Sequence, residues 1–240
     1  KKSINLIAVR LVSKIKNGPD KVKKVAESFG ISSSIYPGEA IALGSSSVYP
    51  LEITSAYSAI ANNGVLVEPT YINKIDNNLG TTLKDIDIKE NYANSNEATI
   101  YLIRDMMRDV IRDGTGQKLR WKYKFYSPVA GKTGTTNKFT DAWFVGFTPQ
   151  VCIGVWIGMD NPAVSIQKYG SEAALPIFGE TINKIYGFGE YSLGSGKVRK
   201  LDDKLDWDVP EEGIVEKKIC KESLKIQNKY CKSKAGLIEE

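Results

Sequence analysis

A short polar stretch near the middle of the chain contains the residues best suited to chemistry. It reads Lys132-Thr133-Gly134-Thr135-Thr136, and two almost wholly apolar segments, 142–147 and 151–158, follow it. Segments of this length and composition are typical of buried strands, and Thr148-Pro149-Gln150 fits a short turn between them. One lysine and several hydroxyl groups at the entrance to such a sheet have no packing role. We therefore take the stretch as a candidate site.

The absence of histidine narrows the chemistry that such a site can perform. None of the 240 residues is histidine, which excludes serine–histidine and cysteine–histidine nucleophiles and histidine-ligated zinc. The three cysteines are not spaced as metal ligands, and we expect neither a metal nor a cofactor. If the protein is a hydrolase or an acyl transferase, its general base must be a lysine or a carboxylate.

Composition sets the broad class of the protein. A chain of 240 residues, 42% of them hydrophobic, can bury a sizeable core as one large domain or as one domain with an appendage. The net charge of +5 comes without a dense basic stripe, so we expect no nucleic-acid partner. No run of eighteen apolar residues is present. Because the first residue is Lys1 rather than methionine, we expect the chain to be part of a longer one.

The spacing of apolar residues predicts several helices around the two strands. Repeats of three and four residues predict helices over 3–16, 20–28, 50–62, 95–113 and 171–186. Asn94 and Glu97 have the spacing of a capping box at the start of the fourth of these helices.

The rest of the chain reads as connections and an appendage. A small hairpin is expected within 65–88, and residues 31–49 and 114–128 read as loops. After residue 187 the composition shifts to glycines, Lys/Asp runs and a proline. We therefore expect one domain over 1–188 and an exposed extension over 189–240.

For some residues the local pattern alone gives an ordinary structural interpretation. Ser3 and Asn5 stand at the start of the first helix, where the simplest interpretation is an N-cap and its neighbour. Cys152 lies in an apolar strand and reads as a buried apolar residue. Cys220 and Cys231 flank a polar segment and would pair in an oxidising compartment, which the sequence leaves open.

The polar stretch and its surroundings resemble the KTG strand of penicillin-binding proteins. The match extends from Ala130-Gly131-Lys132-Thr133-Gly134-Thr135-Thr136 to the run 141–149, in a form similar to that of the bifunctional class A enzymes. Ser3-Ile4-Asn5 matches the S-x-N motif of the family. Residues 42–64 resemble the segment between the two motifs, and 173–178 resemble the closing helix. The resemblance covers residues 1 to about 188.

This resemblance implies a fold and a reaction. The fold would be α+β, of the serine β-lactamase and penicillin-binding transpeptidase type, with an antiparallel sheet flanked by helices and incomplete at its N-terminus. In the family, a serine of an S-x-x-K motif attacks the D-Ala-D-Ala amide of a peptidoglycan stem peptide, a lysine takes the proton, and D-alanine leaves. The amine of a neighbouring stem peptide then attacks the acyl-enzyme and forms a cross-link. Penicillin and other β-lactams acylate the same serine.

The same resemblance assigns catalytic roles to three residues of this chain. Ser3 would relay a proton between the lysines and the leaving nitrogen. Asn5 would orient the motif and bind the substrate amide. Lys132 would form a hydrogen bond with Ser3 and direct positive potential towards the substrate carboxylate.

Three further residues would bind the substrate. Thr133 and Thr135 would bring hydroxyl groups to the substrate carboxylate. Gly134, which has no side chain, would let the substrate pair along the edge of the strand. The backbone N–H of Thr135 would be one donor of the oxyanion hole.

One part of the family's site is missing from this chain. The S-x-x-K serine precedes S-x-N in the family, and this chain begins at S-x-N. Ser13 to Lys16 and Ser165 to Lys168 spell S-x-x-K, but one lies late in a helix and the other in a loop after the KTG strand. We interpret both as chance matches. We therefore expect a chain with two of the three motifs and no nucleophile of its own, which does not form an acyl-enzyme.

Three functional hypotheses follow. The leading one is the C-terminal part of a peptidoglycan D,D-transpeptidase, whose membrane anchor and glycosyltransferase domain precede Lys1 and which works at the extracytoplasmic face of the bacterial cytoplasmic membrane. A D,D-carboxypeptidase or serine β-lactamase-like hydrolase would share the motifs but pass the acyl group to water. A non-catalytic peptidoglycan-binding pseudoenzyme would keep the fold without turnover. An in-frame S-x-x-K upstream of Lys1 would favour the enzyme, and a start codon at Lys1 would favour the pseudoenzyme.

Overall fold

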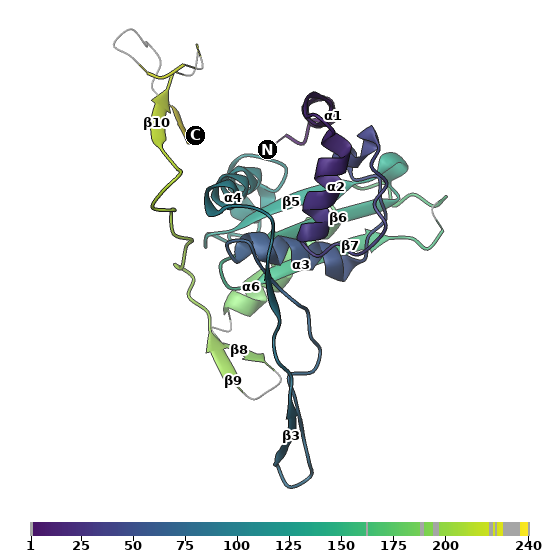
Figure 1. The fold of residues 1–240 in the computed structure, drawn as a ribbon, viewed down its shortest axis with the longest axis vertical. Coiled ribbons are helices and arrows are strands. Elements are labelled where there is room, and N and C mark those ends of the chain that lie inside the picture. Colours follow the sequence, from purple (N-terminus) through teal and green to yellow (C-terminus); the bar gives the residue numbers. More distant parts are fainter. Residues whose placement is uncertain are drawn as a thin grey trace.

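A three-stranded antiparallel sheet forms the centre of the computed structural model (Figure 1). Its strands lie in the order β5 (Ala130–Thr135), β6 (Asp141–Phe147) and β7 (Cys152–Gly158). The polar stretch therefore forms β5, and the predicted apolar hairpin is confirmed as β6 and β7. The structure describes residues 2–161, 163–187, 190–193, 197–220, 223, 225–227 and 236–239.

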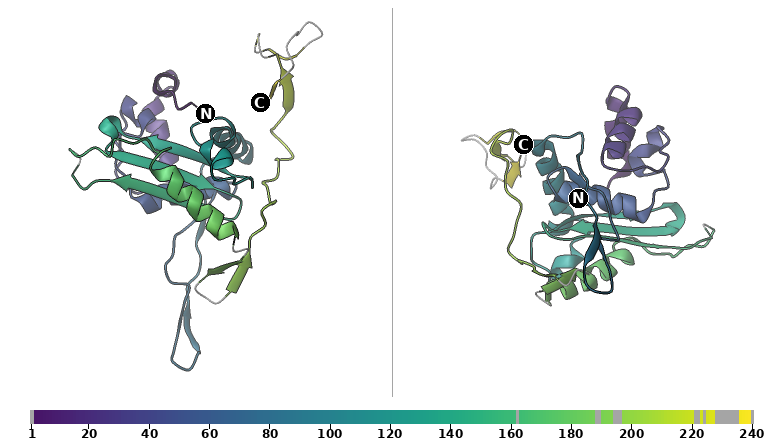
Figure 2. Two further views of the ribbon diagram at one scale, coloured as in Figure 1. Left: turned by 180° about the vertical axis from the view of Figure 1, so that it is seen from behind. Right: turned by 60° about the horizontal axis from the view of Figure 1, so that its bottom comes forward.

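Helices cover both faces of this sheet, which explains why β6 and β7 are almost wholly apolar. Only β6 is an inner strand, because β7 lies at the edge of the sheet among the described residues. α6 (Ala174–Gly187) lies on one face, where the rings of Phe178 and Phe144 pack edge to face with centroids 4.7 Å apart. α3 (Pro50–Ala61) packs on the other face against β6 and β7. Figure 2 shows the sheet between these two layers. The largest fully buried apolar side chains are Phe144, Phe147, Phe178, Ile111, Leu119, Leu175, Ile182 and Val129.

The remaining helices surround this core. They are α1 (Asn5–Lys14), α2 (Gly18–Ser28), the 3₁₀ turn η1 (Glu39–Leu43), α4 (Glu97–Arg112), α5 (Lys118–Trp121) and the 3₁₀ turn η2 (Asn137–Phe139). The five predicted helices are confirmed, with ends shifted by a few residues. The predicted cap of α4 is wrong, because Asn96 rather than Asn94 precedes the helix and accepts a hydrogen bond from Thr99 N. Among the described residues, no helix has both the length and the apolar character that a membrane span requires.

A narrow arm projects from the body between α3 and α4 (Figure 1). Four short strands build it: β1 (Val65–Val67), β2 (Lys74–Asp76), β3 (Thr82–Asp85) and β4 (Glu90–Tyr92). β1 pairs with β4 at its base, and β2 pairs with β3 further out. Asn77 Oδ1 accepts hydrogen bonds from Leu79 N and Thr81 N, which fixes the turn at the tip. The predicted hairpin is confirmed.

The chain after α6 runs along the outside of the body as an extended tail (Figure 1). Its paired strands are β8 (Glu190–Leu193) with β9 (Lys197–Lys200), and β10 (Glu216–Ile219) with β11 (Gly236–Glu239). Trp207 anchors the tail, because its indole N–H donates to Ala61 O at 2.8 Å and its ring packs on Phe147. The guanidinium of Arg104 lies 5.0 Å from the centre of the same ring.

The cysteines differ in their state. Cys220 is buried and takes part in a disulfide bond, and Cys231 lies outside the described residues. Cys152 is a free thiol on β7, and burial raises its pKa to about 12. The division into a domain over 1–188 and an extension over 189–240 stays a prediction, and residues 188 and 189 lie outside the described residues.

Glu52, in the first turn of α3, holds the serine-rich loop 31–49 in place. Its carboxylate accepts hydrogen bonds from the hydroxyl and N–H groups of Ser32 and Ser33, and from Tyr49 N at 3.2 Å. These donors, with the Ser32 hydroxyl first among them, lower the pKa of Glu52 from 4.5 to about 2. The carboxylate therefore stabilises the loop in its ionised form.

Glu52→Gln is expected to lower the free energy of unfolding by about 1–2 kcal/mol at neutral pH, because an amide cannot accept all of these hydrogen bonds. The folded pKa lies below the unfolded one, so the difference is fully present above the unfolded value of 4.5 and disappears as the pH falls towards 2. Urea unfolding of the wild type and of Glu52→Gln, from neutral pH down to about pH 2, measures this difference in the free energy of unfolding. Glu180→Gln, on the exposed surface of α6, is the matched control. An equal loss of stability at every pH would contradict the role of the charge.

Candidate active site

The outer edge of β5 carries the predicted site residues, and no strand of the described chain pairs with that edge. Thr136 N donates to a carbonyl oxygen of β6, and in an antiparallel ladder this pattern repeats at every second residue. The N–H groups of Lys132 and Gly134 therefore face β6, whereas those of Thr133 and Thr135 point to the open edge. Backbone N–H groups on an edge without a strand partner are what an extended peptide needs to add to a sheet.

Lys132 links β5 to the segment that enters α1. It pairs with Val145 on the sheet face that α3 covers. Its Nζ atom donates to Ser3 Oγ at 2.8 Å and to Thr133 O at 2.7 Å. Burial lowers the pKa of this amine, because the folded chain solvates the ammonium less well than water does. The expected hydrogen bond between Lys132 and Ser3 is therefore present.

The interpretation of Ser3 as a helix cap is wrong. Ile4 is the N-cap of α1, and no side chain caps the helix there. The Ser3 hydroxyl is bonded instead to a lysine 129 positions away in the chain. Ser3 has a φ of 50°, in the left-handed region that serine seldom adopts. Asn5 is the first residue of α1 and is exposed.

The hydroxyl groups of Thr133 and Thr135 lie on the sheet face opposite to the lysine, since side chains alternate along a strand. Thr133 is only 9% exposed, and its Oγ1 lies 2.7 Å from Thr115 Oγ1. Thr135 Oγ1 accepts a hydrogen bond from Gly170 N at 3.0 Å. Gly134 lies between the two threonines, and a side chain there would crowd β6. One end of β5 therefore gathers an ammonium group, two hydroxyl groups and free backbone donors.

Reasoning from the sequence missed Thr115 and Gly170. Thr115 lies in the turn between α4 and α5, within the range 114–128 that the sequence predicted as a surface connection. Gly170 lies in the loop that leads into α6. The glycines on both sides of Thr115 are the only local signal of a constrained turn, and nothing local identifies its partner on β5.

The serines of the two S-x-x-K strings are bonded elsewhere. Ser13 Oγ donates to Val9 O at 2.9 Å within α1. Ser165 Oγ donates to Phe139 O at 3.3 Å in the loop after β7. The interpretation of both strings as chance matches stays a prediction.

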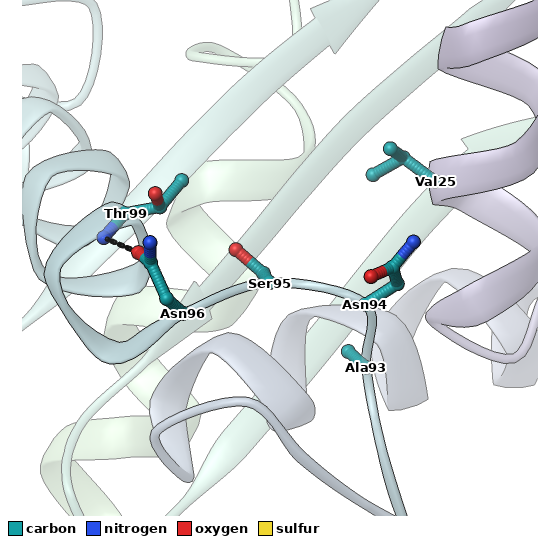
Figure 3. Close-up of a pocket in the computed structure, with 6 residues that line it drawn as sticks. All are labelled: Val25, Ala93, Asn94, Ser95, Asn96 and Thr99. Carbon is teal, nitrogen blue, oxygen red and sulfur yellow. Dashed lines mark hydrogen bonds between the residues drawn. The ribbon is translucent and has the colours of Figure 1, made fainter.

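A separate hollow lies between α2 and the start of α4 (Figure 3). Its lining residues are Val25, Ala93, Asn94, Ser95, Asn96 and Thr99. Figure 3 shows that Asn96 is turned towards the backbone N–H of Thr99, which is the cap of α4. These six side chains include no ionisable group, so the hollow lacks the acid–base groups that the end of β5 offers.

Comparisons with known proteins identify the family. Residues 1–183 match the family model described as the penicillin binding protein transpeptidase domain. Penicillin-binding protein 1A of Aquifex aeolicus is 35% identical over 215 residues, which cover 89% of this chain and 27% of that protein. The crystal structure of penicillin-binding protein 1A from Haemophilus influenzae matches with a TM-score of 0.76 at 23% identity, over 98% of this chain and 38% of that one. The PonA1 protein from Mycobacterium tuberculosis, in complex with penicillin V, matches with a TM-score of 0.63 at 26% identity, over 74% of this chain and 52% of that one.

The chain belongs to the penicillin-binding protein transpeptidase family, and it is class A-like. Its fold is the predicted α+β fold of these transpeptidase domains. The chain spans about a quarter of the length of the curated relatives it matches, 26% and 27% for two of them. The matched residues end within α6, so the tail lies beyond the family model.

Lys132→Met is expected to raise the melting temperature by roughly 2–4 °C at neutral pH, because methionine keeps the apolar contacts and removes a desolvated charge. The folded pKa lies below the unfolded one, so the ammonium opposes folding at neutral pH. This penalty fades as the pH rises towards the ordinary value of 10.5, and the gain should shrink with it. Calorimetry from about pH 7 to pH 10 measures the trend.

The control for this prediction is Lys168→Met, which removes an exposed lysine of the loop that leads into α6. It is expected to leave the melting temperature unchanged at every pH. A Lys132→Met protein that is less stable than wild type at neutral pH would show that desolvation is not the dominant effect on this lysine.

Proposed function

We propose that the chain is part of a peptidoglycan D,D-transpeptidase, which cross-links the stem peptides of the cell wall. The hydrogen bond from Lys132 to Ser3 carries the proposal, because it joins the KTG and S-x-N motifs at 2.8 Å across 129 residues. Membership of the transpeptidase family supports it. The complex of the PonA1 relative with penicillin V supports β-lactams as ligands of the same site.

In this proposal, the acylated serine belongs to an S-x-x-K motif outside these 240 residues. Its oxygen attacks the carbonyl carbon of the D-Ala-D-Ala amide and gives its proton to a lysine. The C–N bond then breaks, the leaving nitrogen takes up a proton, and D-alanine departs. The amine of a neighbouring stem peptide attacks the resulting ester, which forms the cross-link and frees the serine.

The residues around Lys132 would move and hold protons in this reaction. Lys132 holds the Ser3 hydroxyl, and Ser3 relays a proton to the leaving nitrogen. The lowered pKa of Lys132 reduces the cost of passing a proton along this path. Asn5, at the start of α1, binds the substrate amide.

The edge of β5 would bind the substrate itself. The stem peptide pairs with the backbone N–H groups of the edge, and Gly134 leaves room for it. The hydroxyl groups of Thr133 and Thr135 donate to its terminal carboxylate. The N–H of Thr135 stabilises the oxyanion, a contribution of roughly 3 kcal/mol in sites of this type.

The longer protein would carry a membrane anchor and an N-terminal glycosyltransferase domain, and would work at the extracytoplasmic face of the cytoplasmic membrane. The length of the relatives named penicillin-binding protein 1A supports this part of the proposal, since the chain covers only 26% and 27% of two of them.

A non-catalytic peptidoglycan-binding role is the second candidate. It is favoured by one observation, namely that both serines in S-x-x-K strings form hydrogen bonds away from Lys132. The open edge of β5 would then hold stem peptides without turnover.

A fluorescent penicillin distinguishes these candidates. The 240-residue chain is expected to stay unlabelled, because its nucleophile lies elsewhere, and the longer protein is expected to be labelled covalently. Fluorescence of the denatured proteins on a gel measures both results. Stable labelling of the 240-residue chain would overturn the account of the missing serine, and an unlabelled longer protein would favour the non-catalytic role.

Lys132→Ala in the longer protein is expected to slow acylation by penicillin about 10²–10³-fold, because it removes the charge and the contact with Ser3. Stopped-flow or gel-based acylation rates measure the loss, and circular dichroism checks that the fold is kept. Lys168→Ala is the control, and it should acylate like wild type because the proposal gives this exposed lysine no role. A near wild-type rate for Lys132→Ala would exclude Lys132 from the site.

A further inference from the structure

The hydroxyl group of Thr133 is held by a second threonine that neither motif contains. Thr115 Oγ1 lies 2.7 Å from Thr133 Oγ1, and Thr133 is only 9% exposed. With so little access to water, the direction of the Thr133 O–H bond is set by protein neighbours. One hydroxyl of the pair must donate and the other must accept, so the pair has two states.

The backbone around Thr115 fixes the place of its side chain. The turn between α4 and α5 is closed by a hydrogen bond of 2.9 Å from Gly116 N to Val110 O. A side chain at Gly116 would come within 2.8 Å of Ile111, which is fully buried. The turn is therefore packed directly on the core, and Thr115 cannot move away from β5 without breaking these contacts.

The neighbouring hydroxyl of Thr135 is oriented by a different donor. Because its oxygen accepts from Gly170 N at 3.0 Å, its own hydrogen is free to donate. A side chain at Gly170 would lie 2.3 Å from Trp143 O and 2.4 Å from Gly134 O, so this approach requires glycine. Thr133 and Thr135 share one face of β5, roughly 7 Å apart along the strand. A carboxylate between them can accept one hydrogen bond from each.

We propose that Thr115 is a positioning residue for the substrate carboxylate: it donates its hydroxyl hydrogen to Thr133, so that Thr133 in turn donates to the carboxylate. The inference rests on the proposed function, in which the two threonines of β5 bind this group. A carboxylate only accepts hydrogen bonds, so its arrival selects the state of the pair in which Thr115 is the donor. Thr115 itself does not contact the substrate. Without the hydroxyl of Thr115, Thr133 loses the hydrogen-bond donor that orients its own hydroxyl group.

Thr115→Val in the longer protein tests this inference, because valine has nearly the same shape and lacks the hydroxyl. Acylation rates are measured with a penicillin and with the methyl ester of the same penicillin, which has no anionic carboxylate. The variant is expected to lose about tenfold relative to wild type with the penicillin, and to match wild type with the ester. Thr115→Ser restores a hydroxyl and is expected to recover most of the rate.

The matched control is Thr140→Val. It removes a threonine hydroxyl that lies 2.8 Å from Thr136 Oγ1, in the turn between β5 and β6. In this variant, the ratio of the acylation rate with the penicillin to the rate with its methyl ester should stay at the wild-type value.

The outcomes separate this inference from the proposed function. An equal loss with the penicillin and with its ester would overturn the inference, since it would mean that Thr115 only supports the fold. Wild-type rates with both compounds would overturn it as well. If the wild-type longer protein is not acylated by penicillin at all, the proposed function fails, and the inference fails with it.

Discussion

The alternation of side chains along β5 is the constraint on which the site depends. Lys132 belongs to the face that α3 covers and reaches Ser3, whereas Thr133 and Thr135 belong to the face that α6 covers. A slip of one residue would exchange these neighbours and put the lysine beside Phe144 in the core. The register is held because β6 is paired on both sides, with β5 and with β7. The buried hairpin thus places each polar group of the site.

Much of this arrangement follows from sequence patterns with a direct physical cause. Two apolar runs of strand length around a proline turn predicted β6 and β7, because a sheet covered on both faces must be apolar throughout. The polar stretch before them could be singled out for the opposite reason, since nothing in packing explains it. The bond between Ser3 and Lys132 did not follow from periodicity, and the local pattern favoured a helix cap. Only the resemblance to a family brought these two residues together.

The contacts that could not be predicted from the sequence depend on how loops pack against the sheet. The pairing of Thr115 with Thr133 and of Gly170 with Thr135 has no periodicity, because each joins a turn to a strand far away in the chain. The burial of apolar side chains could not be predicted from local patterns either. Apolar spacing predicted the helix α1, yet Leu6, Ile7 and Leu11 are 58%, 61% and 61% exposed. A helical pattern identifies which side chains share a face, whereas the neighbours decide whether that face is covered.

The site also contains features that oppose folding, and contacts between the tail and α4 help to offset them. The positive φ of Ser3 costs about 1–3 kcal/mol in such cases, and the partly desolvated ammonium of Lys132 adds to it. Beyond the family match, Trp207 of the tail packs on Phe147 of β6 and under Arg104 of α4. An ion pair with two hydrogen bonds joins the same helix to Asp206 of the tail. α4 leads directly into the turn that carries Thr115, so the tail braces the helix that brings this hydroxyl to β5.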